Sequence, residues 1–68
     1  MTIDQVQQMI YSEAQRRGWE GLRILGHIDK LRNGNWQALV ERVPSDIGGH
    51  ALVEVACDGA IVRWSPGF

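Results

Sequence analysis

The chain has a single cysteine, only two prolines and no long apolar run. One cysteine excludes a disulfide within the chain, and the usual structural zinc sites need about four cysteine or histidine ligands at tight spacings that are absent here. No apolar run approaches the ~18 residues of a membrane-spanning helix, and residues 1–5 begin a polar helix rather than a secretory signal. We therefore expect a soluble, cytoplasmic protein without a metal or a cofactor.

Neither sign of charge dominates the sequence. The formal net charge is −1, from seven basic and eight acidic side chains. Even the most basic stretch, residues 22–43, carries four basic side chains against two acidic ones. A dedicated nucleic-acid binder usually shows a strongly basic domain with clustered Lys and Arg. The charge therefore favours a protein partner or a second copy over nucleic acid.

The length of 68 residues allows one small domain, residues 1–68, and no more. A chain of this size buries only ~60% of its unfolded surface, so its stability is marginal unless something else contributes. Because disulfide and metal are excluded, dimerisation is the remaining common source of stability. We therefore expect a homodimer.

The first segment has the pattern of an amphipathic helix. Thr2 and Gln5 are spaced as a capping box, in which each side chain satisfies the other residue's backbone N–H. Gly18 suits the left-handed position past a helix end, and Trp19 can then fold back on the last turn. These signals predict a helix over residues 3–17. Its apolar face consists of Ile3, Val6, Ile10 and Ala14.

From Leu22 the hydrophobic period changes to two, and it resumes after Asn33-Gly34, which predicts a β-hairpin. A three-residue loop, residues 32–34, ends with glycine where such loops need a left-handed residue. This register also keeps most apolar side chains of the two strands on one face, unlike a two-residue loop. It predicts three cross-strand pairs: Lys30 with Trp36, Ile28 with Ala38, and Gly26 with Val40.

A second hairpin is predicted by residues 51–57 and 60–64, which flank Asp58-Gly59. A two-residue loop would pair Glu54 with Arg63, Val55 with Val62, and Val53 with Trp64. The competing interpretation is a helix across residues 50–64, which Gly59 and the β-branched residues disfavour. A loop over residues 44–49 separates the hairpins, and Pro44 should end the second strand.

These elements predict an α+β fold, in which one N-terminal helix packs on a three- to four-stranded antiparallel sheet. The predicted order is α-β-β-β-β. The alternative, if residues 50–64 are helical, is α-β-β-α.

Few residues suggest chemistry. His27 and Asp29 share a strand face, so Asp29 can orient the imidazole as a general base requires, although a surface histidine is the simpler interpretation. Cys57 is predicted on the apolar face as a buried, inert thiol rather than as a nucleophile paired with His50. Of the tryptophans, we expect Trp64 in the core and Trp36 half exposed beneath Lys30.

Residues 18–27 carry Gly18-Trp19, then Arg23, then Gly26-His27, between the helix and the first strand. This stretch resembles the helix-then-strand segment of HicA-type ribonuclease toxins, small proteins with a double-stranded-RNA-binding-like fold. In that family the stretch carries a catalytic histidine after a Gly-Ser pair, a role that the resemblance would give to His27. This sequence has no serine at that place, so the resemblance supplies a role for one residue and not a family.

The leading functional hypothesis is a non-enzymatic protein–protein interaction or regulatory module. One helix can cover only one face of the sheet, which leaves the other face, half apolar, for a partner or a second copy. The candidate interaction residues on that face are Leu25, His27, Leu31, Leu39 and Val43. The alternative is a small RNA-binding or RNA-cleaving module, with Arg23, His27, Lys30 and Arg32 as its contacts.

Overall fold

In the computed structural model, which describes residues 2–43 and 49–66, the chain begins with helix α1 (Ile3–Arg16). The predicted capping box is confirmed: the Thr2 hydroxyl accepts from the Gln5 N–H at 3.2 Å, and the Gln5 side chain accepts from the Thr2 N–H at 2.8 Å. At the other end Gly18 has φ +86°, and the Trp19 N–H donates to the Ala14 carbonyl at 2.9 Å. Both ends of α1 therefore form where local sequence signals place them.

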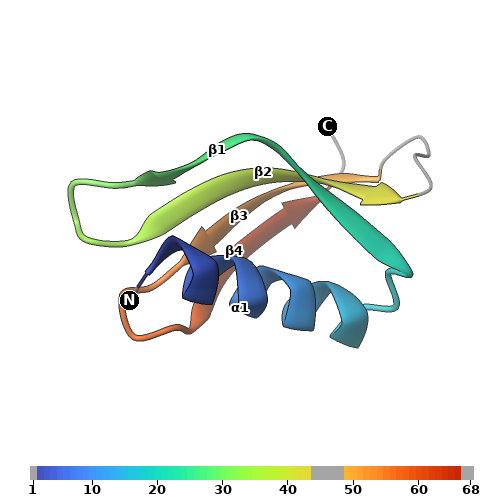
Figure 1. The fold of residues 1–68 in the computed structure, drawn as a ribbon, viewed down its shortest axis with the longest axis horizontal. Coiled ribbons are helices and arrows are strands. Elements are labelled where there is room, and N and C mark those ends of the chain that lie inside the picture. Colours follow the sequence, from blue (N-terminus) through green and yellow to red (C-terminus); the bar gives the residue numbers. More distant parts are fainter. Residues whose placement is uncertain (1, 44–48, 67–68) are drawn as a thin grey trace.

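Four strands follow α1 and form one antiparallel sheet in sequential order (Figure 1). They are β1 (Gly21–Lys30), β2 (Trp36–Val43), β3 (His50–Val55) and β4 (Ile61–Pro66). The α+β fold and its α-β-β-β-β order are confirmed, and the helical alternative for residues 50–64 is wrong. In the described part of the chain, no helix is long and apolar enough to cross a membrane.

The core lies between α1 and one face of the sheet, called here the covered face. Figure 1 shows α1 lying along one side of the strands. In β3 the buried residues are Ala51, Val53 and Val55, whereas the alternate residues are only half-buried, because successive strand side chains point to opposite faces. The apolar face of α1 meets this row. The fully buried core comprises Val6, Ile10, Val40, Ala51, Val53 and Val55.

The first hairpin has the predicted three-residue loop. The Leu31 N–H donates to the Asn35 carbonyl at 2.7 Å, Gly34 has φ +89°, and Lys30 pairs with Trp36. Two of the three predicted pairs are not formed, Gly26 with Val40 and Ile28 with Ala38, and Val40 pairs with Ile24 instead.

The reason is a β-bulge in β1 between Leu25 and Asp29, where Gly26 adopts φ +75°. The bulge places two extra residues in β1, and a shift of two preserves the alternation of faces. Ile24 and Ile28 therefore both still pack against the core, as the predicted faces require. Ile28 and Ala38, however, are no longer direct partners in the register.

The second hairpin differs more from its prediction. Glu54 pairs with Arg63 and Val53 with Trp64 as expected, but Val55 pairs with Ile61 instead of Val62. The cause is a three-residue loop, residues 57–59, closed by the Ala56 N–H donating to the Ala60 carbonyl at 2.7 Å. The Asp58 carboxylate stabilises this loop by accepting from the Ala60 N–H, as Asn33 accepts from Asn35 in the first hairpin.

Three side chains therefore lie elsewhere than the predicted hairpin would place them. Ile61 packs against the core while Val62 is 53% exposed, since the extra residue falls at Val62. Cys57 lies in the loop and is exposed, so the prediction of a buried thiol is wrong. Most of the predicted loop between the hairpins, residues 44–48, lies outside the described residues.

Candidate functional site

The sheet face opposite α1, called here the open face, carries an apolar row across its middle. Leu25, Leu39 and Leu52 are direct register partners on β1, β2 and β3, and all three are half-buried. Among the described elements, no helix or strand packs over them. We call these three side chains the leucine row.

A charged row lies on one side of the leucine row. Arg23, Glu41 and His50 are register partners on the same three strands. The Glu41 carboxylate is buried and bridges its neighbours: one oxygen accepts from the Arg23 guanidinium, and the other lies 3.0 Å from His50 Nε2. We call this set the Glu41 row.

A second polar row lies on the other side of the leucine row. Asp29, Gln37, Glu54 and Arg63 follow one another across the four strands. Glu54 accepts a hydrogen bond from the Asn35 side chain at 2.7 Å. This Gln37 row, like the Glu41 row, contains both signs of charge.

The predicted interaction residues are only partly brought together. Leu25 and Leu39 lie in the leucine row, and Val43 is exposed at the end of β2, opposite Gly21. Leu31 is half-buried where it closes the hairpin loop, and His27 is exposed within the β1 bulge. Leu52 was not predicted as an interaction residue. The alternation in β3 places its side chain on the other face of the sheet from Val53, but the sequence alone did not show that β3 lies beside β2.

The predicted RNA-contact residues are dispersed. Arg23 lies on the open face, whereas Lys30 lies over the Trp36 ring on the covered face, with Nζ 5.6 Å from the ring centroid. Arg32 is exposed in the hairpin loop and His27 in the bulge. These four residues are spread over two sheet faces, the bulge and a loop, so they form no continuous basic surface.

The candidate catalytic pairs are not assembled in the structure. Among the contacts of the described residues, no hydrogen bond or ion pair joins His27 to Asp29. His50 contacts Glu41 in the sheet, while Cys57 lies in the far loop of the second hairpin. Within residues 2–43 and 49–66, no group of three His, Cys, Asp or Glu side chains is placed to hold a metal ion.

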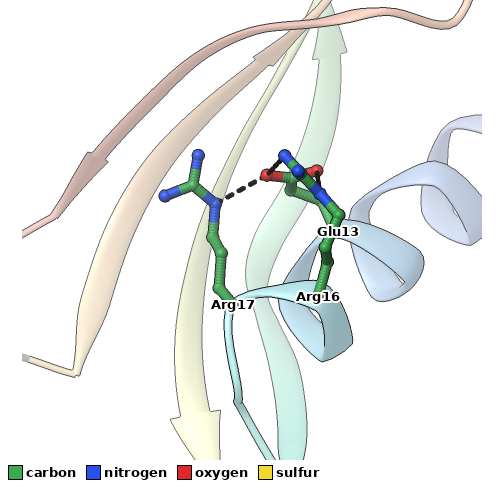
Figure 2. A network of polar contacts seen from close by, with 3 residues as sticks. All are labelled: Glu13, Arg16 and Arg17. Atoms are coloured by element: carbon green, nitrogen blue, oxygen red, sulfur yellow. Dashed lines mark hydrogen bonds and ion pairs between the residues drawn. The ribbon is translucent and has the colours of Figure 1, made fainter.

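A second polar cluster, which the sequence did not indicate, lies at the C-terminal end of α1. Figure 2 shows Glu13 between two arginines of the same helix end. Its carboxylate is buried and accepts from Arg16 Nε and Nη2 at 3.0 and 2.8 Å, and from Arg17 Nε at 2.8 Å. The hydrogen bonds from Arg16, opposed by burial and supported by Arg17, lower the pKa of Glu13 below its usual value.

This cluster forms one wall of a groove of about 480 Å³ between α1 and β4. The Arg17 guanidinium lies over the Trp64 ring, with Cζ 4.7 Å from the centroid, and Trp19 meets Trp64 edge to face at 5.2 Å. Trp64 packs against the core as predicted but remains half-buried, and Trp36 is half-buried beneath Lys30 as predicted.

Comparisons of the chain with protein families, curated proteins and solved structures found no match. The resemblance of residues 18–27 to HicA-type toxins is thus a local likeness without a matching family. Functional inference therefore rests on the two surfaces just described, the open face and the groove.

Proposed function

We propose that this chain is a non-enzymatic interaction module that pairs with a second copy of itself through the open face. The observation that carries the proposal is the leucine row, three aligned leucines at the centre of a sheet face that no described element covers. Apolar side chains at the centre with charged groups at the rim are typical of protein interfaces. Two packed sheets lie about 10 Å apart, close enough for such leucines to interdigitate.

The charges on the open face favour a second copy as the partner. A two-fold axis along the leucine row brings each leucine opposite its own counterpart and the Glu41 row opposite the Gln37 row of the other copy. In that arrangement Arg23 faces Asp29 and His50 faces Glu54, by their positions on the strands. The opposite charges of Arg23 and Asp29 therefore meet on both sides of the axis, as suits an isologous interface.

The size of the chain provides a second reason. With 68 residues and one covered sheet face, the core is small, and burying the leucine row in a dimer adds apolar area that the monomer leaves in water. Each ~100 Å² of apolar surface removed from water contributes about 2.5 kcal/mol before the cost of association. A dimer of this kind stabilises both copies.

Sedimentation velocity of the wild-type chain and of a Leu25→Lys, Leu39→Lys double variant tests the proposal. We expect a dimer for the wild type and a folded monomer for the variant, because each copy would bury two unpaired ammonium groups. Val62→Lys is the matched control, since this apolar side chain is exposed outside the open face and should leave the dimer intact. A wild-type monomer at high concentration would contradict the proposal, and salt-sensitive retention of RNA would instead support an RNA-binding module.

A charge variant tests whether the Glu41 row faces the Gln37 row of the second copy. Asp29→Lys places a cation opposite Arg23 of the second copy and should weaken the dimer about threefold to tenfold. Asp4→Lys makes the same change of charge at an exposed position of α1, and it should not weaken the dimer. Equal weakening by both variants would exclude the two-fold arrangement.

A further inference from the structure

The groove between α1 and β4 has one helical wall and one strand wall. The α1 wall is a single helix face, built from Met9, Ser12, Glu13 and Arg16. The β4 wall consists of four consecutive residues, 61–64. By the register of β4, Trp64 lies on the covered face and Arg63 on the open face, so a groove that both residues line reaches the strand's free edge.

That edge is open to a partner. β4 ends the sheet order, and β3 is its only neighbour in the described sheet. The outer N–H and C=O groups of an edge strand are a template for another extended chain. A groove between a helix and such an edge is a known arrangement for recognising a peptide by strand addition.

The charges of the groove select the kind of peptide. Its lining includes three arginines, Arg16, Arg17 and Arg63, against one carboxylate, in a chain of net charge −1. Glu13 engages only Nε of Arg17, and Figure 2 shows the terminal nitrogens of Arg17 turned away from the carboxylate. The Trp64 ring beneath this guanidinium holds it in place, so its terminal donors are positioned for an added anion.

The groove also offers apolar contacts. Met9 and Val62 line it and are 39% and 53% exposed, among the most exposed large apolar side chains of the described chain. An apolar side chain of a bound peptide can therefore be buried against Met9 or Val62.

We propose that this groove binds an extended acidic peptide, which adds to the sheet as a strand beside β4. The peptide's backbone pairs with the free edge of β4, and its carboxylates accept charge-assisted hydrogen bonds from the arginines. The groove shares Arg63 with the Gln37 row of the open face, but the leucine row does not line it, so peptide binding does not depend on the proposed dimer.

Fluorescence anisotropy with a labelled peptide of alternating valine and glutamate tests the proposal. We expect saturable binding that weakens with salt, and binding about threefold to tenfold weaker for Arg16→Ala. Arg32→Ala is the matched control, because it removes the same charge from an exposed loop outside the groove. The Leu25→Lys, Leu39→Lys variant should bind as the wild type does, which separates this site from the dimer surface.

Two further probes separate strand addition from simple charge attraction. A peptide with lysine in place of glutamate should not bind, and the valine–glutamate peptide N-methylated at alternate backbone positions should bind at least tenfold more weakly, because it loses backbone donors. The proposal is overturned if the wild type does not bind the acidic peptide, if Arg32→Ala weakens binding as much as Arg16→Ala, or if N-methylation has no effect.

Discussion

The two faces of the sheet differ in how they are completed. On the covered face, α1 supplies Val6 and Ile10, and these pack on strand residues such as Val40 and Val53 that have no exposed surface. On the open face, the leucine row stays half-buried between the Glu41 row, in which Glu41 is bridged to Arg23 and His50, and the polar Gln37 row. The covered face holds the fold together, whereas the open face has the composition of a recognition surface.

Each face also contains a buried carboxylate. Glu13 lies at the helix end bordering the covered face, and Glu41 lies in the open face. Each has two basic residues as neighbours, Arg16 and Arg17 for the first, Arg23 and the His50 imidazole for the second. Burial of a carboxylate is tolerated on either face because the charge is compensated where it is desolvated.

The largest expected effect comes from breaking the covered face. Ile10→Ala removes a fully buried side chain from α1 and should lower the free energy of unfolding by about 3 kcal/mol, a large part of the total for so small a chain. Urea denaturation followed by circular dichroism measures this. Met9→Ala, one position along the same helix but 39% exposed, should cost less than about 1 kcal/mol. Equal costs would contradict the assignment of the faces.

The adjacent residues Leu39 and Val40 allow the two faces to be compared within one strand. Val40→Ala should cost about 2 kcal/mol at every protein concentration, because Val40 is fully buried beneath α1. Leu39→Ala should cost about 1 kcal/mol in dilute protein and more in concentrated protein, because it also weakens the dimer. Denaturation midpoints at two concentrations measure the difference. A concentration-independent cost for Leu39→Ala would argue against the open face as the dimer surface.

A smaller effect is expected at the bulge in β1, which adds two residues and so leaves the alternation of side chains between the two faces unchanged. Gly26 has φ +75°, and a Cβ added there would meet nothing within 4 Å, so the cost of Gly26→Ala is conformational alone. We expect about 1 kcal/mol, and less for Gly26→Asn, because asparagine tolerates the left-handed region. Thermal melts of both variants provide the test. Equal destabilisation by alanine and asparagine would show that the backbone conformation is not the cause.

Features set by a few neighbouring residues were predictable from the sequence. The capping box at Thr2, the helix end at Gly18 and the loop at residues 32–34 depend on contacts within about five residues. The faces of β1 and β2 were also predicted, even though the bulge at Gly26 was not. A bulge of two residues leaves the alternation unchanged, so the pattern was correct while two of the pairs built on it were wrong.

Features that depend on competing turns or on distant segments were not predictable. Asp58-Gly59 suits both a two-residue and a three-residue loop, and in the structure the longer loop has Gly59 at φ +97° and an Asp58 carboxylate that accepts from the Ala60 N–H. That choice moved Val62 and Cys57 to the surface. Likewise, Leu52 joins the leucine row only through the pairing of the two hairpins, which no local pattern encodes.

The smallest expected effect concerns Glu13, whose pKa is lowered in the folded chain by the hydrogen bonds from Arg16 and Arg17. A lowered folded-state pKa means that this ion cluster stabilises the fold above the usual carboxylate pKa, and that its contribution disappears as the pH falls through the folded value. Because the arginines are largely exposed, the contribution should be below about 1 kcal/mol.

Glu13→Gln should therefore be less stable than the wild type at neutral pH, and the difference should shrink in acid. Urea denaturation at pH values on either side of this window measures it. Glu20→Gln, at an exposed position just past the helix, serves as the matched control, and an equal pH-dependent change there would show that the effect does not come from the Glu13 cluster.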